Sequence, residues 1–135
     1  MPIRTVVIDD SPLMRISTCL LVKNHPELIL VGSYNSPLEA FEKMGELNPE
    51  LLFLDVEMPK MDGFEFLDKL KRKISVIMNS TAPIFAARAF DYNVSGFLMK
   101  PMLKQIFEKS VAKVVHKSSK STNVYHCKEY LAMCG

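Results

Sequence analysis

The chain has 135 residues, of which 48% are hydrophobic and 24% charged, a composition typical of one globular domain rather than of a disordered or fibrous chain. Its apolar runs, such as residues 28–31 and 51–54, are four residues long, whereas a membrane-spanning helix needs about 20, so the sequence predicts no membrane segment. The net charge of +2 conceals seven lysines against two glutamates in residues 100–135, but no arginine is interleaved with them, and we expect a solvated face without direct nucleic-acid binding.

The first half of the chain alternates short apolar segments with amphipathic ones. Residues 4–8 predict a strand that stops at two aspartates, and the Ser-Pro pair that follows predicts the start of a helix to about residue 24. Residues 28–31 predict a second strand that ends at Gly32. A second Ser-Pro pair opens a second helix, which ends before residues 48–49.

The second half of the chain continues the same alternation. The expected elements are a strand at residues 50–55, a helix at 64–72, a strand at 74–78, a helix at 83–92 and a strand at 96–99. Apolar residues at helical spacing then predict a last helix to about Lys117, namely Leu103, Ile106, Phe107, Val111 and Val114.

Strict alternation of strands and helices forces parallel pairing with right-handed crossovers. The sequence therefore predicts an α/β fold, a doubly wound open five-stranded parallel sheet with helices on both faces. In such sheets, binding sites lie beyond the carboxyl ends of the strands. We expect this domain to span residues 1–117, and residues 118–135, polar and small at first, to form a C-terminal tail or the start of a linker.

The N-terminal segment does not resemble a signal peptide, because its three-residue apolar run at residues 6–8 is followed at once by two aspartates. The three cysteines, Cys19, Cys127 and Cys134, form no close-spaced pair, which suits reduced thiols. We therefore expect a cytoplasmic protein.

Polar side chains close four of the five predicted strands, namely Asp9 and Asp10, Asp55, Ser80 and Thr81, and Lys100. A single strand-end aspartate is most often a turn former or a helix cap. In a parallel sheet, however, all four strand ends meet at one edge, and we expect these side chains to converge there.

Three carboxylates at one edge repel one another, since two unit charges about 4 Å apart cost on the order of 4 kcal/mol at an effective dielectric constant near 20. A cation must lie among them, and oxygen ligands of this kind suit Mg²⁺. Lys100 adds a compact positive charge that can hold phosphate oxygens. This inventory matches the needs of phosphoryl transfer, with Asp55 as the nucleophile.

Four segments of the chain, VVIDDSPLMR, LLFLDVEMPKMDGFEFL, VIMNST and GFLMKP, together resemble the receiver domain (CheY-like) of bacterial two-component response regulators. The resemblance covers residues 3 to about 117. It implies the flavodoxin-like receiver fold with strand order 2-1-3-4-5. It also implies a phosphoacceptor signalling switch that takes a phosphoryl group from a histidine kinase and is not an enzyme beyond Mg²⁺-dependent self-phosphorylation and slow autodephosphorylation.

Carried over by position, the resemblance implies a role for each acidic residue of the edge. Asp9 and Asp10 resemble the acidic pair of the metal site, with Asp10 the more direct ligand. Asp55 resembles the phosphoacceptor, which is also a metal ligand. The carbonyl of Glu57 would complete the Mg²⁺ shell, and its side chain either tunes the access of water or lies in solvent.

The remaining matches are less uniform. Lys100 resembles the family lysine, and Phe97 resembles the aromatic residue that rotates inward on activation, although a core aromatic is equally compatible with its position. We expect Ser80 to be the phosphate-binding switch hydroxyl, with Thr81 as the alternative. Asn79 departs from the family pattern, because a hydrophobic strand residue is common there, and the sequence offers no account of it beyond a hydrogen bond at the edge of the site.

Phosphorylation is expected to shift a pre-existing equilibrium and reshape the surface of the fourth helix, fifth strand and last helix. The expected partners are a histidine kinase and a downstream protein or output domain. The interval between Ser80 and Lys100 resembles that of receivers attached to LytTR-type DNA-binding domains. A phosphorylation-dependent homodimer is a further option.

Two other interpretations remain open at this stage. FLDVE resembles the nucleophile motif of haloacid-dehalogenase-like phosphatases, although Glu57 replaces the second aspartate and two strands precede it. The other interpretation is a receiver that keeps the fold but has lost the chemistry and only binds a partner. The presence of all the expected side chains argues against it.

Overall fold

The computed structural model describes residues 1–120, and the side chains of residues 1–117. The tail that we expected at residues 118–135 therefore lies outside the described side chains, although the last helix continues to Lys120. Among the described residues, no helix combines the length and apolar character needed to cross a bilayer.

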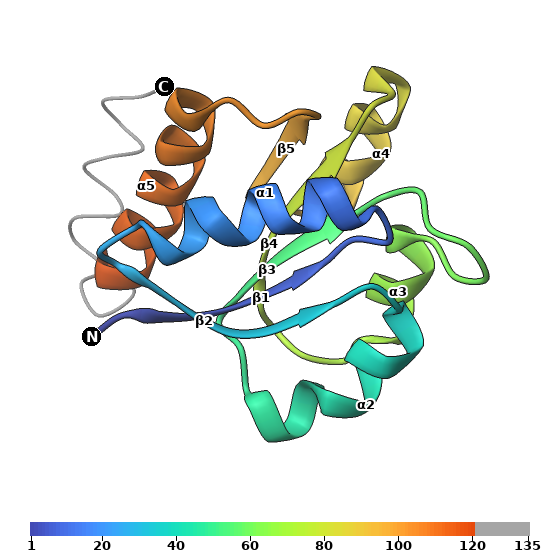
Figure 1. Ribbon diagram of the computed structural model, residues 1–135, viewed down its shortest axis with the longest axis horizontal. Helices are drawn as coiled ribbons and strands as arrows, with labels where there is room; N and C mark the ends of the chain where they lie inside the picture. Colours follow the sequence, from blue (N-terminus) through green and yellow to red (C-terminus); the bar gives the residue numbers. More distant parts are fainter. Residues whose placement is uncertain (121–135) are drawn as a thin grey trace.

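Five parallel strands form one sheet in the order β2-β1-β3-β4-β5, which confirms the predicted α/β fold and strand order (Figure 1). The strands are β1 (Ile3–Ile8), β2 (Leu28–Tyr34), β3 (Leu51–Asp55), β4 (Ser75–Ser80) and β5 (Gly96–Met99). The helices are α1 (Pro12–Lys23), α2 (Pro37–Leu47), α3 (Gly63–Lys69), α4 (Ala86–Asp91) and α5 (Lys104–Lys120), and a 3₁₀ turn, η1 (Pro83–Phe85), precedes α4.

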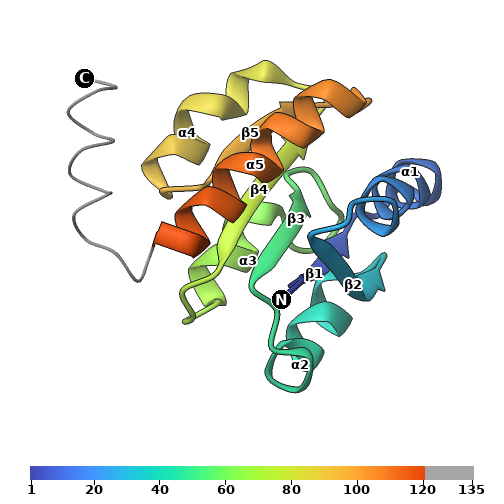
Figure 2. The ribbon, with the colours of Figure 1, turned by 90° about the vertical axis from the view of Figure 1, so that its left-hand side faces the viewer.

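Helices cover both faces of the sheet (Figures 1 and 2). On one face, α2, α3 and α4 bury side chains such as Met44, Phe64 and Ala89 against the strands. On the other face, α1 and α5 bury Val22 and Phe107, among others. The central strand β3 is buried along its whole length, as expected for a parallel sheet that is covered on both sides.

Side-chain caps begin the first three helices. Ser11 and Ser36 cap α1 and α2 as predicted, each accepting a hydrogen bond at 3.4 Å from the backbone N–H three residues later. At α3, Asp62 and Glu65 form a reciprocal capping box, with N–H to carboxylate distances of 2.9 and 3.1 Å. This capping box fixes the point at which the loop after Asp55 enters α3.

Several elements end elsewhere than the sequence predicted, and β4, for example, runs to Ser80 rather than to residue 78. β2 continues through Gly32 to Tyr34, and a register shift against β1 accompanies the glycine, which therefore marks an irregularity rather than a strand end. α3 stops at Lys69 rather than at residue 72. Arg72 instead donates hydrogen bonds to the Met44 carbonyl at 2.6 Å and to Asn48 Oδ1 at 3.0 Å, and these tertiary contacts compete with continuation of the helix.

Two glycines provide a matched test of packing beneath the loop after β3. A Cβ atom on Gly63 would lie 2.6 Å from the Asp55 carbonyl oxygen, whereas a Cβ atom on Gly45, within α2, would have no neighbour within 4 Å. We expect Gly63→Ala to lower the free energy of unfolding by about 1 to 3 kcal/mol through overpacking. Gly45→Ala should raise it by about 1 kcal/mol through helix propensity. Urea denaturation measures both, and equal effects of the two substitutions would contradict this account.

Candidate functional site

Acidic side chains from two adjacent strands meet at the carboxyl edge of the sheet. Asp9 and Asp10 follow β1 directly, and Asp55 is the last residue of β3. One carboxylate oxygen from each of the three lies within 4.8 Å of the others. Asp9 and Asp55 are only 1% and 3% exposed, and Asp10 is partly buried.

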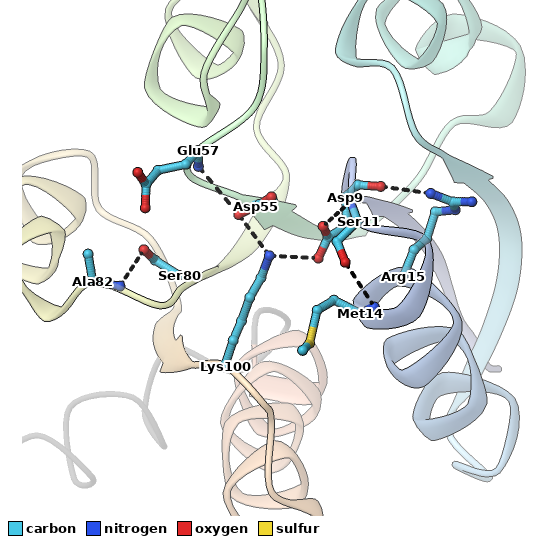
Figure 3. Close-up of polar contacts among 9 residues, drawn as sticks. All are labelled: Asp9, Ser11, Met14, Arg15, Asp55, Glu57, Ser80, Ala82 and Lys100. Carbon is cyan, nitrogen blue, oxygen red and sulfur yellow. Dashed lines mark hydrogen bonds and ion pairs between the residues drawn. The ribbon is translucent and has the colours of Figure 1, made fainter.

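Lys100 supplies a positive charge to this cluster, as Figure 3 shows. Its Nζ atom lies 3.0 Å from Asp9 Oδ2 and 3.0 Å from Asp55 Oδ1, and its side chain is 8% exposed. The lysine follows β5, and β4 lies between β5 and β3, so its side chain extends across the end of β4 to reach both carboxylates.

Burial and charge perturb the protonation of this pair. Burial raises the pKa of Asp55 to about 7, with the neighbouring Asp9 carboxylate acting in the same direction and the Lys100 ammonium against it. Burial alone would lower the pKa of Lys100, but its ion pairs with Asp9 and Asp55 raise it overall. Lys100 therefore stays charged at neutral pH, whereas Asp55 exchanges its proton in that range.

Backbone N–H groups orient the two buried carboxylates, and a side-chain donor holds the backbone of Asp9. The Ser11 N–H donates to Asp9 Oδ1 at 3.0 Å, and Arg15 donates to the Asp9 carbonyl at 3.0 Å. The Glu57 N–H donates to Asp55 Oδ1 at 3.3 Å. Sequence analysis missed Arg15, for which its position in the first turn after the aspartates was the only available signal.

The donor set suits a divalent cation with a preference for oxygen. Asp9 Oδ2 is buried and makes no hydrogen bond, although it is ion-paired with Lys100, so it has capacity for a further positive partner. Asp10 and Asp55 bring two more carboxylate oxygens to the same place. These residues fit Mg²⁺, which is bound in proteins through one or two carboxylates together with retained waters. The side chain of Glu57 is exposed.

The two candidate hydroxyls differ in position. Ser80 ends β4, is 1% exposed and accepts a hydrogen bond from the Ala82 N–H at 2.9 Å, whereas Thr81 is exposed. Phe97 lies on β5, partly buried against the cluster under α2, α3 and α4. The structure thus gathers Asp9, Asp10, Asp55 and Lys100 at one point. Ser80 lies at the end of the strand next to Asp55 (Figure 3).

Comparison with known proteins agrees with this arrangement. The family model described as "Response regulator receiver domain" matches residues 5–115. The response regulator domain of Thermotoga maritima CheB superposes with a TM-score of 0.73 at 30% identity, over 84% of this chain and 97% of that one.

Curated relatives match most of this chain in sequence. A protein-glutamate methylesterase/protein-glutamine glutaminase of Albidiferax ferrireducens is 39% identical over 107 residues, and one of Hydrogenovibrio crunogenus is 35% identical over 130 residues. The matches cover 75% and 90% of this chain but 29% and 35% of those proteins, so the chain spans about a third of the length of these relatives. The family match excludes the dehalogenase-like alternative, and the chain belongs to the response regulator receiver domain family.

Proposed function

We propose that this receiver is a phosphoacceptor switch in which Asp55 takes a phosphoryl group from a histidine kinase. The observation that carries the proposal is the position of the Lys100 ammonium, 3.0 Å from both Asp55 and Asp9 in a nearly buried site. A cation held beside a strand-end carboxylate and facing a cluster of oxygen ligands is the arrangement that an incoming phosphoryl group requires.

In the transfer step, a carboxylate oxygen of Asp55 attacks phosphorus. A new O–P bond forms while the bond between phosphorus and the donor nitrogen breaks, and the electron pair of that bond leaves with the histidine of the kinase. Lys100 offers its N–H groups to the phosphoryl oxygens, and the Glu57 N–H, which now contacts Asp55 Oδ1, helps to orient the nucleophile. A Mg²⁺ ion held by Asp9, Asp10, Asp55 and the carbonyl of Glu57 would offset charge on those oxygens.

The acyl phosphate would act on the surface through Ser80. A phosphoryl group adds strong acceptors, and each charge-assisted hydrogen bond contributes about 1.5 to 3 kcal/mol. Moving the populations of two conformations from 1:99 to 99:1 needs about 5.5 kcal/mol. One or two such bonds therefore shift a pre-existing equilibrium between the conformations but do not complete the shift. We propose that Ser80 and Phe97 move together and reshape the surface of α4, β5 and α5. Exposed apolar side chains on all three elements, Phe90, Met99 and Ile106, support a role in partner binding, including a phosphorylation-dependent homodimer.

The output partner is assigned by class. The curated relatives are named as methylesterases and glutaminases, which favours an output of that enzymatic class over the LytTR DNA-binding domain suggested by spacing. The receiver itself is proposed to turn over no external substrate beyond slow autodephosphorylation. We propose that it ends near residue 117, with a tail or linker beyond, and that it acts in the cytoplasm, where the buried free thiol of Cys19 would stay reduced.

Labelling with a small phosphodonor tests the acceptor assignment. With Mg²⁺ and acetyl phosphate, the wild-type chain should gain one phosphoryl group, and Asp55→Asn should gain none because the attacking carboxylate is gone. Asp91→Asn, which changes an exposed carboxylate at the end of α4, is the matched control and should be labelled like the wild type. Intact-protein mass spectrometry reads the result, and labelling of Asp55→Asn at the wild-type level would exclude Asp55.

A second pair of variants identifies the switch hydroxyl. Ser80→Ala should still be labelled on Asp55 but should lose most of the phosphorylation-dependent NMR shifts in α4, β5 and α5. The reason is that the variant lacks the buried hydroxyl that would move to hydrogen-bond the phosphoryl group. Thr81→Ala should keep those shifts, because Thr81 is exposed. The reverse pattern would assign the role to Thr81.

The raised pKa of Asp55 predicts a pH dependence of stability without metal. The folded state binds the Asp55 proton more tightly than the unfolded chain, so this contribution is full below the usual pKa of 3.8 and is lost as pH rises to about 7. Relative to Asp55→Asn, wild-type stability should fall over this interval by about 1.4 kcal/mol per pH unit at most, and Mg²⁺ should reduce the loss. Urea denaturation of both proteins at several pH values checks this, and parallel pH profiles would contradict it.

A further inference from the structure

Asn79 is the one residue of the family motifs that the sequence left unexplained, and it lies on β4 beside Asp55. It pairs with Asp55 on β3 and with Leu98 on β5. Because paired residues of neighbouring parallel strands point to the same face, Asn79 shares its face with the Asp55 carboxylate. The Asn79 side chain is not needed to satisfy the backbone at this point, because the Asn79 carbonyl already accepts a hydrogen bond from the Val56 N–H at 3.0 Å.

The side chain of Asn79 is buried with an unmet acceptor. The residue is 2% exposed, and its Oδ1 atom has no hydrogen-bond partner. Its same-face neighbours toward the core, Phe53 and Ile77, are fully buried and apolar. A buried polar atom without a partner lowers stability, so an amide at this position needs a compensating role.

The lysine offers a donor on the same face of the sheet. Lys100 continues the pairing with β4 beyond β5, since its N–H donates to the Ser80 carbonyl at 2.9 Å. It follows Leu98 by two residues and so returns to the face of Asn79. To reach Asp55, its side chain crosses β4, whose last residue on that face is Asn79. An ammonium carries three N–H donors, and the ion pairs with Asp9 and Asp55 account for two of them.

We propose that Asn79 is a positioning residue for Lys100. The amide oxygen of Asn79 accepts a hydrogen bond from the Lys100 ammonium when the carboxylates of Asp9 and Asp55 bind a divalent cation. In the metal-free state the acceptor stays unmet and the ammonium is held by the carboxylates. Once a cation takes those carboxylates, Asn79 retains the ammonium at the edge of the site, where it faces an incoming phosphoryl group. This inference deepens the proposed function and rests on it.

A matched pair of variants tests the role. Asn79→Val and Asn79→Thr have nearly the same shape and both suit a strand, but only threonine keeps an oxygen acceptor. In the full chain, titrated with MgCl₂ by calorimetry, Asn79→Val should weaken Mg²⁺ binding about tenfold, because the ammonium then has no alternative to the carboxylates. Asn79→Thr should stay within about threefold of the wild type. The melting temperature of metal-free Asn79→Val should rise, since the unmet acceptor is gone.

A double-mutant cycle separates this role from simple packing. In a Lys100→Met background, Asn79→Val should leave the Mg²⁺ affinity unchanged, because the ammonium that Asn79 positions is absent. An equal loss in both backgrounds, or wild-type affinity in Asn79→Val alone, would overturn the role of Asn79. If the wild-type chain itself bound no Mg²⁺ and took no phosphoryl group, the proposed function would fall as well, so the two failures are distinguishable.

Discussion

The crowding of three carboxylates around one lysine is the constraint on which the rest of the site depends. Asp9 and Asp55 are almost fully buried, and each would be costly to ionise alone. The Lys100 ammonium lies at the same distance from both and so offsets part of the repulsion. With Asp55 ionised, however, one ammonium faces three carboxylates, and the site keeps an excess of two negative charges, which matches the charge of a divalent cation.

The strand order explains how this crowding arises. β1 and β3 are neighbours, so their terminal aspartates lie side by side, while β5 lies two strands from β3. A lysine is long enough to cover that separation, and its alkyl chain can lie along the apolar surface between the strands. Asn79 shares its face of the sheet with Asp55, and alternation along β4 turns Ser80 to the opposite face, which α2, α3 and α4 cover. Neighbouring residues of β4 thus have different surroundings.

Much of the fold and part of the site could be predicted from the sequence. The alternation of elements, the two serine caps and the edge at which Asp9, Asp55 and Lys100 converge follow from local rules, and the strand order came from the family resemblance rather than from periodicity. The passage of β2 through Gly32 and the early end of α3 could not be predicted, because a register shift and the long-range hydrogen bonds of Arg72 decide them. The equal sharing of Lys100 between two aspartates depends on the reach of its side chain. The structure brings the acidic residues and the lysine together, but the roles of all the site residues, Asp55 and Lys100 included, remain predictions.

The attachment of α4 suggests why a small energy suffices for the proposed switch. α4 is one short helix after a 3₁₀ turn, and it is tied to α3 by the Arg88 guanidinium, 4.3 Å from the centre of the Phe64 ring, and by a 2.9 Å hydrogen bond from Tyr92 to Asp68. Contacts of this kind contribute about 0.5 to 1.5 kcal/mol each. Their sum is comparable to one or two charge-assisted bonds formed at Ser80. Of α4 itself only Ala89 is buried, whereas every residue of β3 is buried. A phosphoryl group at Asp55 would therefore move α4 while leaving the sheet intact.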